Sequence, residues 1–192
     1  MSEFKQKFNT EIRPVLRNIM KLDNILAVPT LEKVVLSASF GRSMKDSANM
    51  NFIFKEMKMI SGQVPVIAKA KKSVSSFSVR EGMDSSAFVT LRSDRMFDFI
   101  YEFVNITLPR VVGFEGLSSK SFDGQGNYNF GLKDHLPFIE STETGFTFGM
   151  NVAIVTTADT DYNSKILMQA LNFPFKGEVN DVIKKVKGGV NG

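Results

Sequence analysis

The chain has 192 residues, 43% of them hydrophobic, which is enough to bury the core of one domain or of a domain with extensions. Its formal net charge of +4 is only mildly basic, so any nucleic-acid surface must be local. The lack of cysteine excludes disulfides, thiolate chemistry and cysteine-based metal sites, and a single histidine argues against imidazole clusters. No apolar run approaches the roughly 20 residues that span a bilayer, so we expect a soluble protein with no membrane partner.

The N-terminal third carries two helical patterns around one strand pattern. Apolar residues over 8–20 recur at helical spacing, and Pro14 should kink or restart that helix. Alternation over 31–40 predicts a strand with one polar face. A second helix is predicted over 47–60, with Asp46 or Ser47 as N-cap and Gly62 at its C-terminal end. The cations of the first helix, Lys5 among them, are expected on a solvated face.

Residues 63–92 form the stretch around which the chain is organised. Two β-prone runs, 64–68 and 87–91, flank a segment rich in lysine and serine, which predicts a long hairpin with a basic tip. Between 69 and 80 this segment has no carboxylate, and its cations are Lys69, Lys71, Lys72 and Arg80. An unneutralised basic projection suits a polyanion, but a solvated basic loop explains the same residues equally well.

The second half of the chain is predicted to begin with a helix that is capped by Ser93 or Asp94 and ends at Pro109. A glycine-rich loop with interleaved aromatic residues, predicted to be ordered, follows over 113–131. Alternation over 147–157 predicts a strand near the sheet centre, and a last helix begins at Thr160 or Asp161 and stops before Pro174.

This order of elements predicts the α+β class: an antiparallel sheet with helices packed on one face, a long basic β-hairpin and a projecting glycine-rich loop. We expect one domain over 1–176 and a loosely held basic tail over 177–192. The uncovered sheet face is a candidate binding surface, and strand alternation places on it Ser37, Ser39, Thr90 and Arg92.

Several ordered blocks of this sequence resemble the ribosomal protein L5 family, which binds 5S ribosomal RNA (rRNA). The resemblance covers about residues 3–176. The blocks are Val28-Pro29, Gly62-Gln63-Val64-Pro65-Val66, Ala68-Lys69-Ala70-Lys71-Lys72-Ser73, Arg80-Glu81-Gly82-Met83, Leu108-Pro109-Arg110-Val111, Lys120-Ser121-Phe122-Asp123-Gly124 and Ile154-Val155-Thr156-Thr157-Ala158. The chain departs from the family pattern at Leu36-Ser37-Ala38-Ser39 and over 134–149.

The resemblance implies a structural, non-enzymatic protein of the large ribosomal subunit that acts in translation. It would bind 5S rRNA or equivalent rRNA in the central protuberance through the sheet, at Lys33, Ser37, Ser39, Gln63, Thr90 and Arg92. The hairpin would contact P-site transfer RNA (tRNA) at Lys69, Lys71, Lys72, Ser73, Ser76 and Arg80. The glycine-rich region would add Arg110, Ser118, Lys120, Ser121 and Asn127. Expected partners also include neighbouring protuberance proteins and the small-subunit head protein S13. The alternative is a protein scaffold of the protuberance without 5S contact.

Rival chemistries find little support in the residues. The 124–127 segment lacks the spacing and third glycine of a dinucleotide loop, and the serines and lysine over 118–121 have no second catalytic motif beside them. His135 has no partner at ligand spacing, so a surface or hydrogen-bonded histidine is the simplest interpretation. We therefore expect no enzyme activity, no cofactor and no metal.

The cellular location follows from composition only in outline. Many phenylalanine, lysine, asparagine and isoleucine residues together with no tryptophan indicate AT-rich coding, as in organelle genomes and some bacteria. The chain begins near the usual start of the family, which leaves no room for a cleavable presequence. A ribosome of the mitochondrial matrix is the preferred expectation, with the bacterial cytoplasm as the alternative.

Overall fold

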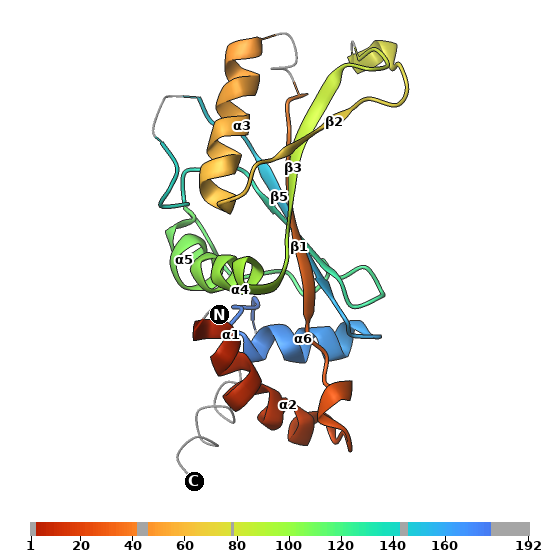
Figure 1. Ribbon diagram of the computed structural model, residues 1–192, viewed down its shortest axis with the longest axis vertical. Helices are drawn as coiled ribbons and strands as arrows, with labels where there is room; N and C mark the ends of the chain where they lie inside the picture. The colour runs from red at the N-terminus through yellow and green to blue at the C-terminus, as the bar shows by residue number, and fades with distance from the viewer. Residues whose placement is uncertain (1–2, 42–45, 78, 143–145, 178–192) are drawn as a thin grey trace. The chain divides into compact units, whose positions relative to one another are not determined.

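The computed structural model describes residues 3–41, 46–77, 79–142 and 146–177. Within them the strands form one 5-stranded antiparallel sheet in the order β2-β3-β1-β5-β4 (Figure 1). The strands are β1 (Leu31–Ser39), β2 (Val66–Lys69), β3 (Asp84–Leu91), β4 (Tyr128–Leu132) and β5 (Met150–Thr156). Together with the helices, this sheet confirms the predicted α+β class.

The helices fall into three types. The α-helices are α1 (Glu3–Lys7), α2 (Arg13–Met20), α3 (Ser47–Ser61), α4 (Ser93–Glu102), α5 (Leu108–Arg110) and α6 (Asp161–Ala170). Short 3-10 turns lie at Ile25–Ala27 and Ser75–Phe77, and π-helical turns at Phe8–Ile12 and Phe103–Thr107. None of the helices in the described segments has the length and apolar character needed to cross a bilayer.

The chain divides into two compact units, which we call the first and the second unit. The first consists of Met1–Val34, Arg92–Phe130 and Ala153–Gly192, and the second of Val35–Leu91 and Gly131–Val152. The expected loosely held tail falls, apart from Gly177, outside the described residues. Each unit is described below by itself.

Two prolines sit inside helices because a π turn precedes each of them. The N–H of Arg13 donates to the carbonyl of Phe8 and that of Leu108 to Phe103, five residues back, and the prolines come one residue later. A widened turn relieves the clash between a proline ring and the carbonyl four residues before it. Pro14 therefore restarts the first helix as expected. The prediction that Pro109 ends its helix is wrong, because α5 continues to Arg110.

Most helix termini follow the predicted capping chemistry. The Asp46 carboxylate accepts from the N–H of Ala48 at 3.0 Å, and Gly62 closes α3 with a left-handed φ of 61°. Thr160 caps α6 by accepting from the N–H of Asn163. The start of α4 differs, because its N-cap is Arg92 without a side-chain cap, so the expected cap at Ser93 or Asp94 is wrong.

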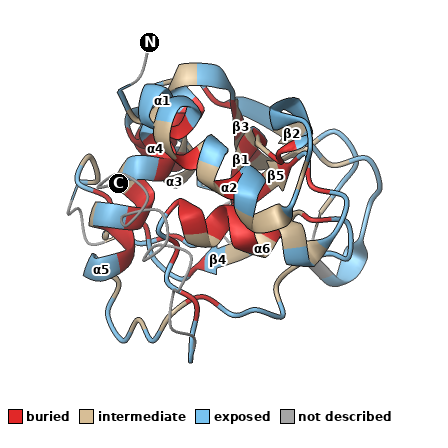
Figure 2. Ribbon diagram, turned by 90° about the horizontal axis from the view of Figure 1, so that it is seen from below, coloured by how far each residue is buried: buried red, intermediate tan, exposed pale blue. Residues whose placement is uncertain are grey.

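Aromatic rings fill the core of the first unit. Phe103 stacks on Phe99 with ring centroids 5.7 Å apart and meets Phe173 at 6.5 Å, while Phe8 of the first π turn lies 5.5 Å from Phe97. Half of the residues of α6 are buried, whereas α1 has no buried residue (Figure 2). These contacts join α4 and the two π turns to the segment that follows α6.

The second unit buries one face of its strands against α3. The inward residues of β3, namely Ala87, Val89 and Leu91, are buried, and α3 contributes Ile53 and Met57. The alternation predicted for β1 and β5 is confirmed, with Leu36 and Ala38 or Met150 and Val152 inward and their neighbours more exposed. The strand β4 was missed by the sequence analysis, which assigned its first residues to the glycine-rich loop.

Candidate nucleic-acid interface

The hairpin of the second unit is built from β2, β3 and a turn between them (Figure 1). Antiparallel register pairs Val66 with Phe88 and Lys69 with Asp84. Beyond the strands, backbone hydrogen bonds continue the pairing between Ala70 and Met83, and an isolated bridge joins Val74 to Val79. The tip is therefore tied back on itself by backbone bonds.

The cations of the hairpin point outward. Lys69, Lys71, Lys72 and Arg80 are all exposed, and in the described part of the chain none of them forms an ion pair. Carboxylates are nevertheless near in the chain, because Glu81 follows the tip and Asp84 stands opposite Lys69. Lys71 and Lys72 carry the unneutralised charge of the tip.

The serines of the tip have different surroundings. The Ser73 hydroxyl accepts from the backbone N–H of Glu81 at 2.9 Å and so helps to close the turn. Ser76 lies in the short 3-10 turn and is exposed. Ser73 thus shapes the turn, while Ser76 keeps a free surface position.

The less buried face of the second unit carries the predicted polar residues of the sheet. Ser37 and Ser39 lie on β1, Gln63 lies just before β2, and Thr90 lies on β3. Ser39 is exposed, and the other three are half-buried. The amide nitrogen of Gln63 donates to the carbonyl of Thr90 at 3.4 Å. This bond holds Gln63 beside Thr90, which brings together two residues that lie far apart in the sequence.

The same face has an apolar component that the sequence analysis did not single out. Phe88 precedes Thr90 by two residues, so both side chains stand on one face, and Val66 is the cross-strand partner of Phe88. Val66 is 57% exposed and Val64 58% exposed, which is unusual for β-branched residues in and beside a strand. An aromatic ring among polar groups on an open sheet is a surface on which nucleic-acid bases can stack. In the sequence, this apolar component could have been found from the alternation of Phe88 with the buried residues of β3.

Two predicted sheet residues belong to the first unit and have a different electrostatic setting. The Nζ of Lys33 and the guanidinium of Arg92 lie 3.8 and 3.7 Å from the same carboxylate oxygen of Glu32. Exposed pairs of this kind are weak, so a polyanion can compete for both cations. Lys33 and Arg92 are therefore partly neutralised cations.

The glycine-rich region of the first unit is ordered by aromatic contacts and hydrogen bonds. The rings of Phe122 and Tyr128 meet edge to face at 4.8 Å, and Phe175 lies 5.9 Å from Tyr128. The phenol of Tyr128 donates to the carbonyl of Ser118 at 2.9 Å. Burial raises the pKa of Tyr128, so the phenol keeps its proton.

Around this ordered loop the predicted contact residues divide into surface and structural positions. Arg110, Ser118 and Lys120 are exposed, and Ser121 is half-buried. The Asn127 amide donates to the Asp123 carboxylate at 2.7 Å, a bond that holds the pKa of that carboxyl below its usual value. The Asn127 side chain is thus already engaged within its own loop.

Two further expectations are corrected by the geometry. Lys5 is not a free cation on a solvated helix, because its Nζ bonds the Asp94 carboxylate at 2.7 Å and the Ser93 hydroxyl at 3.0 Å. His135 is not at the surface, because its side chain is fully buried. The described residues contain no group of three or more acidic or histidine side chains that could hold a metal ion.

Comparison with known proteins gives matches over most of the chain. Two family models match, one described as "Ribosomal protein L5" over residues 24–80 and one for the C-terminal region of the same ribosomal family over residues 84–175. The chain is 42% identical over 172 residues to the large ribosomal subunit protein uL5 of Lactobacillus johnsonii, covering 88% of this chain and 96% of that protein. The uL5 of Halothermothrix orenii is 42% identical over 177 residues, covering 91% of this chain and 99% of that protein.

An α+β fold matched over most of its length by such relatives defines a structural, non-enzymatic protein of the large ribosomal subunit, which acts in translation. The chain belongs to the ribosomal protein L5 family. The family implies association with large-subunit rRNA and ribosomal proteins. These relatives are bacterial, and they lend no support to the expected mitochondrial location.

Proposed function

We propose that the second unit binds 5S rRNA, or an equivalent large-subunit rRNA segment, through the open sheet face defined by Ser37, Ser39, Gln63 and Thr90. The observation that carries this proposal is the Gln63 to Thr90 hydrogen bond beside a half-buried Phe88. Hydroxyl and amide groups read base and sugar edges, and an aromatic ring supplies a stacking surface. Lys33 and Arg92 of the first unit, together with Arg110, Ser118, Lys120, Ser121 and Asn127, are proposed as further contacts.

The proposal assigns a second role to the hairpin. Its tip presents Lys71 and Lys72 without carboxylate partners among the described residues, in a turn held by backbone bonds. Such a tip can approach a phosphate backbone without disturbing a core. We assign it to contact with P-site tRNA, and we place the protein beside neighbouring central-protuberance proteins and S13 of the small-subunit head, in a bacterial rather than a mitochondrial ribosome.

The test of the sheet is a binding titration of the full chain with a 5S rRNA fragment at several salt concentrations. Log affinity should fall linearly with log salt, since cations that contact phosphates release counterions. Thr90→Val and Gln63→Leu should each weaken binding about threefold to tenfold, the effect of one or two lost hydrogen bonds.

Thr147→Val is the matched control, because Thr147 is an exposed threonine of the same unit outside the proposed face. It should bind like the wild type. Equal losses in all three variants would refute the assignment of the face. If the wild type binds no 5S rRNA but still enters large subunits, the protein acts as a scaffold within the protuberance.

A further inference from the structure

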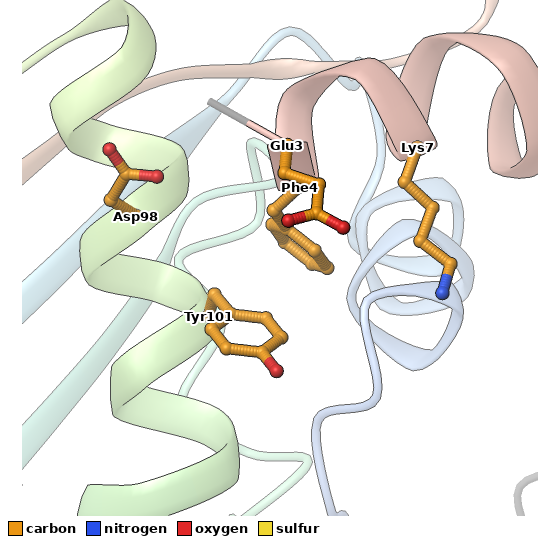
Figure 3. Close-up of a pocket in the computed structure, with 5 residues that line it drawn as sticks. All are labelled: Glu3, Phe4, Lys7, Asp98 and Tyr101. Atoms are coloured by element: carbon orange, nitrogen blue, oxygen red, sulfur yellow. The ribbon is translucent and has the colours of Figure 1, made fainter. Parts of the chain in front are cut away.

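A cleft of about 290 Å³ lies in the first unit between α1 and α4, on a surface to which no RNA contact is assigned. Asp98 and Tyr101 come from α4, and the remaining lining residues from α1 (Figure 3). The lining residues are Glu3, Phe4, Lys7, Asp98 and Tyr101. The cleft therefore combines two carboxylates, one ammonium group and two aromatic rings.

The aromatic walls are held in place from behind. The Phe4 ring lies 5.3 Å from the ring of Tyr101, tilted by 55°, and meets the buried Phe97 edge to face at 6.4 Å. Tyr101 is 51% exposed, so part of its ring stays open to a partner. Next to the cleft, the Lys5 to Asp94 ion pair at 2.7 Å ties α1 to α4. The cleft is thus open to solvent, and packing holds its aromatic wall in place.

The charged side chains that line the cleft do not pair with one another. In the described part of the chain, Glu3, Lys7 and Asp98 form no ion pair with one another or with other residues. The five lining side chains, with two carboxylates and one ammonium group, sum to one negative charge, although the whole chain carries +4. Two carboxylates without ion-pair partners among the described residues can pair with a cation, so the charge favours a cationic protein segment over a phosphate backbone.

We propose that this cleft binds an arginine side chain from a basic segment of another protein. A guanidinium group is planar, so it stacks on the exposed face of Tyr101 while its N–H groups reach the carboxylates of Glu3 and Asp98. A lysine ammonium would make the same charge contacts without stacking. The α1 and α4 surface is then a protein-docking surface, and this inference does not depend on the assignment of the RNA face.

The test uses the full chain and a short labelled peptide of arginine and serine residues, with binding followed by fluorescence anisotropy. Replacing both acids, as E3Q with D98N, should weaken binding by roughly threefold to tenfold, because two exposed charge contacts are lost. Lys7→Gln removes the like charge and should tighten binding by roughly twofold. A lysine and serine peptide should bind the wild type less well than the arginine peptide.

The matched control replaces two acids of the first unit that do not line the cleft, as D23N with D159N; both residues are exposed. This control changes the net charge equally and should bind like the wild type. Three results would overturn the proposal: equal weakening in both double variants, equal affinity for the two peptides, or a cross-link from Tyr101 to rRNA rather than to protein in the ribosome. Loss of 5S rRNA binding in the sheet variants would leave it untouched.

Discussion

His135 is enclosed by aromatic rings of the second unit. Its ring stacks on Phe148 with centroids 4.3 Å apart and an interplanar angle of 14°, and Phe52 meets it edge to face at 5.9 Å. The nearest carboxylate belongs to Glu56, 4.0 Å from Nε2, and that group already accepts hydrogen bonds from Thr142. Burial lowers the pKa of His135, against the opposing influence of Glu56, Asp134 and a backbone hydrogen bond with Thr142, so the folded protein holds the ring neutral.

This burial makes stability depend on pH in a defined direction. The unfolded chain protonates His135 near its ordinary pKa of 6.5, and the folded chain does so only at lower pH. The unfolded state therefore binds more protons in this window, and the free energy of unfolding falls as the pH drops below 6.5 toward the lowered pKa. His135→Phe keeps the aromatic stack and removes the titration, so we expect the variant to lose less stability over the same window.

Urea unfolding of both proteins at a series of pH values measures the difference. Because the chain has a single histidine, the gap between the two curves reports this residue alone. At neutral pH the variant should be about as stable as the wild type, because phenylalanine keeps the stack on Phe148. Curves that stay parallel from about pH 7 to about pH 5 would contradict a buried neutral histidine.

At the scale of elements, the glycine-rich loop is anchored to the start of α6. The Asp161 carboxylate accepts from the N–H of Gly124 at 3.2 Å and of Gly126 at 2.9 Å. The Thr156 hydroxyl donates to the carbonyl of Gly126 at 2.7 Å. A carboxylate in the first helical turn also interacts favourably with the helix dipole, so one residue serves both elements.

The two glycines of this anchor give a matched pair of variants. Gly126 has a φ of +78°, and an added Cβ would lie 2.5 Å from the carbonyl oxygen of Ala158. Gly124 has a φ of +87° and open space around the same position. Gly124→Ala should cost about 1 kcal/mol, from backbone conformation alone. Gly126→Ala should cost about 2–4 kcal/mol because the clash with backbone is added.

Denaturant unfolding of both variants under the same conditions checks this order. Far-UV circular dichroism should show native helix and strand content for Gly124→Ala. Equal losses of stability in the two variants would mean that the close approach of Gly126 to Ala158 carries no weight.

The elements predicted from sequence are those with a clear local signal. Strand alternation placed Ser37 and Thr90 on one face, and capping residues fixed both ends of α3. The strand β4 was missed because Asn129 and Gly131 dilute its β propensity within a glycine-rich segment. The π turns were missed because a five-residue hydrogen-bond step leaves the apolar spacing of a helix almost unchanged. The setting of His135 depends on rings from distant segments, so no local pattern could reveal it.

At the scale of the whole molecule, the surfaces that we propose for RNA and for protein partners differ in the sign of their charge. The hairpin tip has two lysines without carboxylate partners in the described residues, whereas the cleft of α1 and α4 has an excess of carboxylate. A net charge of +4 hides this contrast, because it sums regions of opposite sign. We therefore expect polyanions and basic proteins to bind different parts of the same chain.

The separation predicts that the hairpin tip acts in tRNA binding and not in holding the protein on its rRNA. Lys71→Ala combined with Lys72→Ala removes two exposed charges, and each lysine that contacts a phosphate should lower the salt slope of tRNA binding by roughly one. Binding of P-site tRNA to assembled ribosomes should weaken, as measured by filter binding at several salt concentrations. Incorporation into the large subunit and 5S rRNA binding should stay normal, because the tip is tied by backbone bonds and both lysines are exposed.

The matched control replaces two exposed lysines of α3, as K55A with K58A, which changes the charge of the second unit equally and leaves the tip intact. This control should bind P-site tRNA like the wild type. If both double variants lose tRNA binding equally, the effect comes from net charge and not from the tip. A tip variant that folds normally yet fails to enter the large subunit would show that the hairpin anchors assembly, because its lysines would then contact rRNA rather than tRNA.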